Sequence, residues 1–428
     1  MKRLRKILKW TGIVAGAAIA ILLMVNANFV WSTGTRLERR LRELRQAGEP
    51  VQLADLAREP IPPETNADVF LRRAGDDLDA IQKELLTVYP KVGYPTAAVT
   101  PADQERLEKM FAAYPKVMPL LEQAADCPDF DPQPDSTLPP SRFLEPFMER
   151  TQKHRLLARV LRAHSAMLLS KGRTDDALAT QILTLRLTRH WRREPLTIGY
   201  LITLACEQSA MEGVNHVLQA GPVSSSSRQA LESELALHDT MEGYRWAMRS
   251  ERAFSLSSIR EFPGTGFWLT RGFANDVMSR IIDLYDQYLK KASQPYAEVV
   301  SERSAAPAPG GGPNLYGPLV TLLVPAMNAV RPPTERVRAM SRSLRVLNAL
   351  QARKPDGNDR VPNLSDLGLP GEVTIDPFNG EPLHVKRLPE GWMVYSVGRD
   401  LVDDGGILDG NTDVGAGPIR REEPQKKP

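Results

Sequence analysis

An uncharged apolar run near the amino terminus constrains this chain more than any other feature of its sequence. It covers 22 residues, from Trp10 to Trp31, and has a tryptophan at each end. A helix rises 1.5 Å per residue, so this run is long enough to cross the hydrocarbon core of a bilayer, and tryptophan is typical of both interfaces. The sequence therefore predicts a membrane anchor over residues 10–31, preceded by a basic tail over residues 1–9.

A cleaved signal peptide is the alternative interpretation of this segment. The stretch from Trp10 to Met24 has signal length, and the tripeptide VNA at 25–27 permits cleavage. We favour an uncleaved anchor, because the apolar character continues past that point through Phe29 and Val30. Lys and Arg number five before the run and five just after it, so counting positive charges does not orient the span.

The net charge of the body argues against nucleic acid as a partner. The formal net charge of the chain is +3, but five cations without a neighbouring acid stand ahead of the apolar run, which leaves −2 for the remainder. A body with this balance has no general attraction for a phosphate backbone.

Residues 32–65 are expected to connect the anchor to the body. Leu37, Leu41 and Leu44 follow helical spacing, so the membrane helix continues outward as a short stalk that ends at Gly48 and Pro50. Prolines at 60, 62 and 63 then predict an extended crossing, followed by a helix that begins near Asn66.

The region 66–303 is predicted to be a multi-helix body, because its apolar residues recur with helical periodicity. Gly172 and Ala177 have the spacing of a turn and a small contact residue in an αα-hairpin. The stretch 221–227, GPVSSSS, ends one helix and caps the next. Three apolar stripes define helices: Leu157, Leu161, His164 and Leu168; Leu178, Ile182 and Leu185; Leu201, Leu204, Met211, Val214 and Leu218.

A small α+β unit is expected at the carboxyl end. Proline and glycine are dense enough over 304–314 to predict a flexible linker. The tail, 315–415, then contains a helix at about 333–353 and two alternating stretches, PLHVKR and GWMVYSV, joined as a β-hairpin. Residues 416–428 are expected to be disordered. The predicted fold class is thus mainly α, with an anchor helix, a helical body and a small α+β tail.

A glycine-rich loop in this tail concentrates negative charge. Calcium prefers six to eight oxygen ligands, and glycines let the main chain fold around it. The alternative is a solvated acidic loop, whose self-repulsion costs little in salt. Two coordinating sets are open, Asp400 with Asp403 and Asp404, or Asp409 with Asn411 and Asp413. The candidate metal ligands are Asp400, Asp403, Asp404, Asp409, Asn411 and Asp413.

The tail resembles the globular domain of the major pseudopilins of type II secretion. The matching residues are Asp376-Pro377-Phe378, Gly380, Pro382, Tyr395-Ser396, Gly398 and Asp400. The resemblance implies a structural calcium in the loop after the YS-hydrophobic-G signature, and it carries over Asp400 alone as a ligand. The amino-terminal span lacks the prepilin cleavage pattern, so filament assembly is not expected.

The rest of the chain is similar to a family of uncharacterised, membrane-anchored proteins of planctomycete-type bacteria. The similarity lies in RQAGEPVQLADL, IPPETNAD and the RSERAF stretch near residue 250. It implies an anchor, a helical body and an exported location, where calcium is plentiful. We therefore expect a cytoplasmic amino terminus and a body on the periplasmic side of the inner membrane.

A second constellation of polar residues recurs at helical spacing: His238, Glu242, Arg245, Arg249 and Arg252. On one continuous helix these side chains share a face that a metal, a carboxylate or a phosphate would fit. A solvated, salt-bridged helix face explains the same spacing, and we favour it. His164, on an apolar stripe, is expected to be a hydrogen-bonded core residue rather than a ligand.

No sequence motif identifies a reaction. HExxH, GxSxG, GxxxxGK[ST], CxxC and a GxGxxG that follows a strand are all missing. Cys127 and Cys206 are not spaced like metal ligands. Cys206 is expected to be a small buried apolar residue. The alternative is a disulfide bond between the two cysteines. The sequence therefore favours a non-catalytic envelope scaffold with an unknown protein partner. The alternative is an envelope hydrolase that uses the His238 and Glu242 face.

Overall fold

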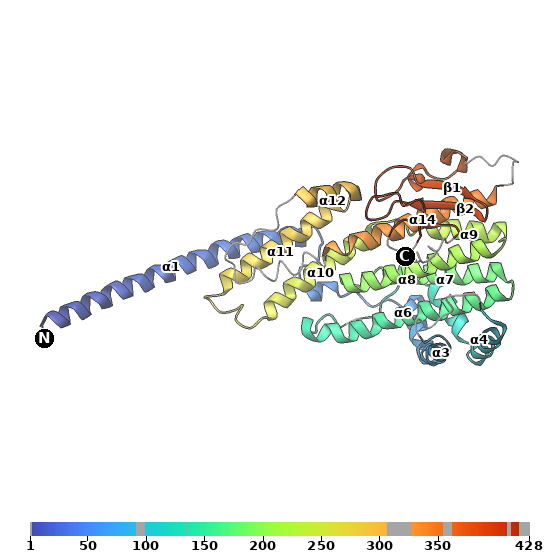
Figure 1. The fold of residues 1–428 in the computed structure, drawn as a ribbon. Helices are drawn as coiled ribbons and strands as arrows, with labels where there is room; N and C mark the ends of the chain where they lie inside the picture. Colours follow the sequence, from blue (N-terminus) through green and yellow to red (C-terminus); the bar gives the residue numbers. More distant parts are fainter. Residues whose placement is uncertain are drawn as a thin grey trace, which may run out of the picture.

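The computed structural model describes residues 2–90, 99–133, 135–305, 327–353, 362–408 and 412–418. Over these residues the protein is mainly helical, with a small antiparallel sheet near the carboxyl end (Figure 1), so the predicted fold class is confirmed. The α-helices are α1 (Lys2–Gln46), α2 (Ala67–Arg73), α3 (Gly75–Val88), α4 (Pro101–Ala113), α5 (Val117–Asp126), α6 (Pro140–Ser170), α7 (Thr174–Trp191), α8 (Thr197–Ala220), α9 (Ser225–Ala236), α10 (Glu242–Glu261), α11 (Arg271–Lys291), α12 (Tyr296–Ala305) and α14 (Arg331–Ala352).

Helix α1 contains both the apolar run and the predicted stalk. Its amino-terminal part projects away from the body, while Leu37, Leu41 and Leu44 are buried against it (Figure 1). Gly48, with φ of +70°, ends the helix: the Gly48 N–H donates to Arg45 O and the Glu49 N–H donates to Leu44 O. Among the described residues α1 is the one helix long and apolar enough to cross a membrane, a property that it shares with signal segments.

Helix α11 lies beside α1 and runs parallel to it. The rings of Phe29 and Phe273 meet edge to face, with their centroids 5.1 Å apart. Further along both helices, Arg40 Nη2 lies 2.8 Å from Asp283 Oδ1 and 2.8 Å from Asp286 Oδ2. The parallel pairing holds the stalk at a fixed orientation to the body.

The segment between α1 and α2 contains two short 3₁₀ turns, η1 (Leu53–Leu56), which precedes the prolines at 60, 62 and 63, and η2 (Pro63–Thr65), which begins at the last of them. The crossing is therefore less extended than the sequence predicts. Asn66 begins the next helix as predicted, because its side-chain oxygen accepts the N–H of Asp68 and caps α2. Ser224 caps α9 in the same way through the N–H of Ser227.

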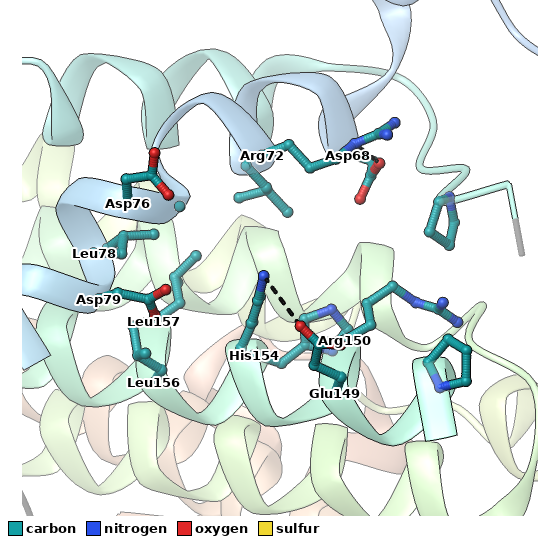
Figure 2. A pocket seen from close by; sticks show the side chains of 15 residues that line it. Asp68, Arg72, Asp76, Leu78, Asp79, Glu149, Arg150, His154, Leu156 and Leu157 are labelled. Atoms are coloured by element: carbon teal, nitrogen blue, oxygen red, sulfur yellow. Dashed lines mark ion pairs between the residues drawn. The ribbon is translucent and has the colours of Figure 1, made fainter. Parts of the chain in front are cut away.

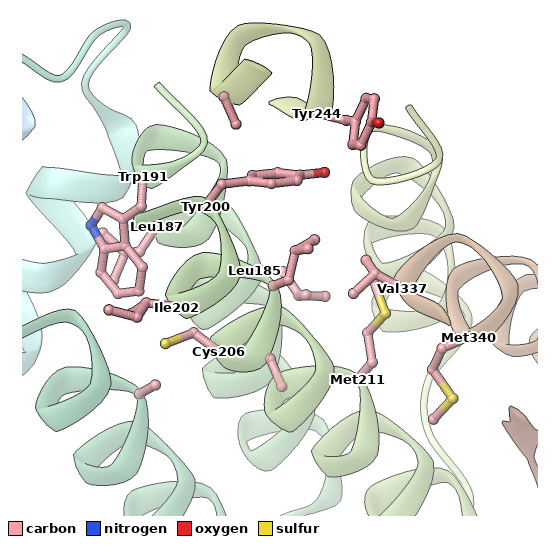
Figure 3. Packing of buried hydrophobic residues seen from close by; sticks show 14 of the residues in the cluster. Leu185, Leu187, Trp191, Tyr200, Ile202, Cys206, Met211, Tyr244, Val337 and Met340 are labelled. Atoms are coloured by element: carbon pink, nitrogen blue, oxygen red, sulfur yellow. The ribbon is translucent and has the colours of Figure 1, made fainter. Parts of the chain in front are cut away.

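Helices α6 and α7 form the predicted αα-hairpin. Gly172 makes the turn with φ of +71°, and Ala177 is fully buried at the contact between the two helices. Figure 3 shows the core that α7, α8, α10 and α14 build around Leu185, Trp191, Tyr200 and Met211. These side chains form the largest apolar cluster of the described residues.

The tail packs on the body rather than standing apart from it. Strands β1 (His384–Leu388), β2 (Gly391–Ser396) and β3 (Val414–Ala416) form an antiparallel sheet in that order, and Leu388 pairs with Gly391 across the predicted hairpin. Two 3₁₀ turns, η3 (Leu364–Leu367) and η4 (Gly371–Thr374), precede the sheet. Helix α14 lies between this sheet and helices α8 and α9 (Figure 1), so the body and the tail share one core.

Two predicted segments fall largely outside the described residues. Residues 304 and 305 of the expected linker form the end of α12, and 306–314 lie outside. Of the terminus at 416–428, Ala416 ends β3, Gly417 hydrogen-bonds to α8, and 419–428 lie outside.

Candidate functional site

The five polar residues that the sequence places on one helix face do not share a face. Helix α9 ends at Ala236 and α10 begins at Glu242, so His238 lies in the connection between two helices. His238 is fully buried, whereas Glu242 is exposed in the first turn of α10. The prediction of one continuous helix is wrong here, because helical spacing alone does not reveal a turn of five residues.

His238 belongs to a buried network that joins α7, α8 and α9. Its Nε2 lies 3.1 Å from Glu234 Oε1, and its Nδ1 lies 3.4 Å from Glu207 Oε1. Arg192 donates to both oxygens of Glu207, at 2.5 and 2.8 Å. Burial alone would raise the pKa of Glu207, but Arg192 and His238 outweigh it and lower the pKa to about 2. Every charge in this network has a partner within it, so the network stabilises the packing of these helices against one another.

The three arginines of α10 also contact their own chain. Arg252 is fully buried and pairs with Glu49 and, at 2.9 Å, with Asp286 Oδ1. Arg249 Nε lies 3.4 Å from Glu49 Oε1. Arg245 donates to Ser293 Oγ at 3.0 Å. These contacts tie α10 to the end of α1 and to α11, and they leave no cluster of arginines to grip an external anion.

His164 contacts a core partner, as the sequence predicts. Its Nδ1 lies 3.3 Å from Thr180 Oγ1, and its ring meets that of Phe111 edge to face. Burial lowers the pKa of His164 to about 4, so the ring is neutral at pH 7.

The acidic loop holds its carboxylates mainly with its own backbone. Asp413 is fully buried and accepts the N–H of Gly406 at 2.6 Å and the N–H of Asp404 at 3.4 Å. Asp403 accepts from the Tyr395 hydroxyl at 3.0 Å, and Asp400 accepts from the N–H of Val402 at 3.2 Å. Asp409 and Asn411 lie outside the described residues.

The fit of a cation to this loop rests on two observations. Asp404 Oδ2 is buried without a hydrogen-bond partner. Burial raises the pKa of Asp413, and the charges of Asp403 and Asp404 raise it further, as expected of carboxylates that approach one another without a cation. Within the described residues, however, no group of three or more His, Cys, Asp or Glu is arranged to hold a metal. Asp404 and Asp413 are therefore the described carboxylates that would contribute to a calcium site, and by themselves they do not complete one.

The residues that match the pseudopilin pattern meet in space at Asp376. This buried carboxylate accepts the N–H of Phe378 at 2.8 Å, the hydroxyl of Ser396 at 2.8 Å and the N–H of Val397 at 2.9 Å. Asp376 thereby joins the DPF turn to the end of β2. Its role in the described structure is to position the chain that enters the acidic loop.

The sequence does not predict a cavity that opens between helices of the body. This cavity, of about 300 Å³, lies between α2 and α3 on one side and α6 on the other (Figure 2). Acids and bases line it together, with leucines deeper inside: Asp68, Arg72, Asp76, Asp79, Glu149, Arg150, Lys153, His154, Leu71, Leu78, Leu156 and Leu157. No spacing motif marks these residues, because α2 and α3 precede α6 by more than fifty residues.

Arg150, on the wall of this cavity, belongs to an internal ion pair. Arg150 donates to both oxygens of buried Glu194, at 2.7 and 2.8 Å. His154 stacks on Trp191 with ring centroids 4.2 Å apart. Burial and the charge of Arg150 lower the pKa of His154 to about 3, so its ring stays neutral and does not exchange protons near pH 7.

The lining of this cavity combines carboxylates and cations with leucines. Its described residues include no serine, threonine, cysteine or tyrosine, so hydroxyl and thiol nucleophiles are missing from it. Arg150 is committed to Glu194, and Asp68 is paired with Arg72 at 2.6 Å. At the rim, the exposed side chains of Glu149 and Lys153 form a loose ion pair, with Nζ and Oε1 3.9 Å apart. Such a cavity accepts a polar group at its rim and an apolar group against its leucines.

A second cavity, of about 180 Å³, opens near the first. The two share Pro132 in their walls, and the second is also lined by Arg58, Phe143, Glu194 and Trp246. The segment around Pro132 thus separates two hollows on this part of the body.

The two cysteines are both free and buried, so the structure contains no bridge between Cys127 and Cys206. Burial raises the pKa of the Cys206 thiol to about 12, which makes it unreactive.

Comparisons of the chain with protein-family models, with curated proteins and with solved structures return no match.

Proposed function

We propose that this protein is a non-catalytic interaction protein of the cell envelope, anchored by α1, with its body exported and its acidic loop stabilised by calcium. The observation that carries the proposal is the continuity of α1, whose exposed apolar run passes without a break into the buried stalk of Leu37, Leu41 and Leu44. A body held so firmly on a membrane helix suits the presentation of a surface to a partner.

The polar groups of the body support a role without catalysis. His238, Glu207 and Arg252 form ion pairs with other residues of the same chain. The alternative of a hydrolase needs His238 and Glu242 on one face, and the described geometry gives that alternative no support. The mixed-charge cavity between α3 and α6 is the surface that we propose for the protein partner.

Labelling in intact cells tests the orientation. The native cysteines are buried, so a single Leu237→Cys variant, at an exposed position, adds one reactive thiol. We expect a membrane-impermeant maleimide to label this thiol in spheroplasts before lysis. Labelling that requires lysis would contradict an exported body.

Site-specific photocrosslinking tests the partner surface. A photoreactive residue in place of Lys153, on the cavity rim, is expected to give a crosslinked product of higher mass in native membranes. Lys109 is the matched control, since its side chain is also exposed but it does not line the cavity. Equal crosslinking from both positions, or from neither, would reject the cavity as the partner surface.

A further inference from the structure

The loop between α10 and α11 exposes an unusual amount of apolar surface. Phe262, Phe267, Trp268 and Leu269 are 48%, 54%, 45% and 45% exposed, all within residues 262–269. Exposed aromatic side chains this close together cost free energy in water, and such patches typically mark contact with a membrane or another protein. A partner surface is therefore expected to cover this loop.

A hydrogen bond fixes the loop against the apolar part of α1. The side-chain amide of Asn26 donates to the backbone carbonyl of Trp268 at 3.1 Å. Asn26 stands inside the uncharged run from Trp10 to Trp31. An amide in an apolar span is costly unless it finds a partner, and this carbonyl supplies one.

Close packing keeps the loop at that level of α1. A Cβ on Gly272 would come within 2.5 Å of the Phe29 ring, so the start of α11 approaches α1 as closely as only glycine allows. Since α11 then runs parallel to α1, the loop is the part of the body nearest to the apolar run, as Figure 1 shows.

The geometry sets the depth of the loop relative to the interface. Asn26 precedes Trp31 by five residues, which corresponds to about 7.5 Å along a helix. If Trp31 marks the headgroup level, as tryptophan commonly does, the Trp268 backbone lies that much closer to the hydrocarbon. This depth falls within the roughly 5–10 Å to which interfacial elements are buried.

We propose that residues 262–269 form a second membrane contact, a loop whose aromatic side chains insert into the leaflet on the side of the body. Exposed Arg271, at the start of α11, then lies at the level of the lipid phosphates. The inserted loop and α1 together would prevent the body from tilting about a single helix. This inference rests on the proposal that α1 spans the membrane.

Nitroxide accessibility in lipid tests the proposal with the full chain. Single variants Phe267→Cys and Trp268→Cys are labelled and reconstituted in phosphatidylcholine–phosphatidylglycerol vesicles. Power saturation with oxygen, which partitions into lipid, is compared with saturation by a water-soluble nickel chelate. Val14→Cys, an exposed position inside the apolar run four residues after Trp10, serves as the lipid reference. Leu237→Cys serves as the water reference, because it lies beyond the other end of α10, whose 20 residues span about 30 Å.

We expect the labels at 267 and 268 to resemble the label at 14, with oxygen access exceeding nickel access. Labels that behave like the one at 237, while the label at 14 is in lipid, would overturn the inserted loop and leave the anchor intact. Labels shielded from both reagents would indicate a second chain over the loop and would also overturn the proposal. A water-exposed label at 14 would refute the anchor itself.

Discussion

Asn215 on α8 pairs with the backbone of Gly417 through two hydrogen bonds. Its Nδ2 donates to Gly417 O at 3.0 Å, and its Oδ1 accepts the Gly417 N–H at 2.8 Å. The Asn215 side chain thus takes the place of a neighbouring strand at the end of β3. The pair connects residues 202 positions apart in the sequence and fixes the tail to the body.

Replacing Asn215 with alanine is expected to destabilise the whole protein. The change leaves a buried N–H and a buried carbonyl of Gly417 without partners, and each such group costs about 1–3 kcal/mol. Denaturant unfolding of the Asn215→Ala variant should therefore show a loss of about 2–6 kcal/mol. Glu212→Ala, at an exposed position on the same helix, is the control and should change the unfolding free energy by less than about 0.5 kcal/mol. Similar values for both variants would contradict this account.

Arg252 is expected to be the most important charge at the junction of α1 and the body. Arg252→Leu leaves Glu49 with Arg249 and Asp286 with Arg40 as their remaining, more exposed partners. The loss of the hydrogen bonds that the buried Arg252 guanidinium donates to these charged groups should cost about 1.5–3 kcal/mol. Arg249→Leu removes a more exposed contact to the same Glu49 and should cost less than about 1 kcal/mol. The measurement is the unfolding free energy of each variant in the same detergent. Equal losses would show that burial does not distinguish the two arginines.

Three histidines whose pKa values are lowered in the folded protein predict that stability falls with mild acid. Burial lowers the pKa of His154 to about 3 and of His164 and His190 to about 4, each from 6.5. Between pH 6.5 and 4 the unfolded chain binds protons that the folded chain does not, so the unfolding free energy decreases as the pH falls. At pH 5 each histidine accounts for a loss of about 2 kcal/mol.

A histidine variant tests this assignment. Between pH 6.5 and 4.5, the slope of the unfolding free energy against pH should be smaller for His164→Gln than for the unsubstituted protein. The difference in slope corresponds to about one proton fewer taken up on unfolding. Glu207 does not interfere, because its pKa is lowered from 4.5 to about 2 and its contribution is lost only below pH 4.5. An unchanged slope would mean that His164 is protonated in the folded state.

Calcium is expected to raise the melting temperature of the full chain. A ligand that binds only the folded state at 100 times its dissociation constant adds about 2.7 kcal/mol to the unfolding free energy. The full chain is required, because α14 and the sheet share their core with the body. Asp404→Asn should abolish the shift, and Glu372→Gln, which is exposed outside the loop, should retain it. Superimposed melting curves in calcium and in chelator would reject the metal.

Local patterns in the sequence were sufficient to predict much of the fold. The apolar run, the stalk leucines, the turn at Gly172, the cap at Ser224 and the hairpin after Leu388 were all predicted, because each depends on residues within a few positions of one another. The same locality explains the error at His238. The spacing of His238, Glu242 and Arg245 is helical, but the chain turns between Ala236 and Glu242, and the partners that stabilise the turn lie on α7 and α8.

The sequence by itself therefore determined the long apolar helix at the amino end, the helical class of the body and the elements of the tail, since hydrophobic periodicity and capping act over short stretches. Only the tertiary structure decided which charges are buried, where the cavity opens and which face of α14 supports the sheet. Contacts such as Glu49 with Arg252 and Asn26 with Trp268 join residues more than 200 positions apart. Their free energy depends on burial and on distance in space, and no local pattern encodes either of these.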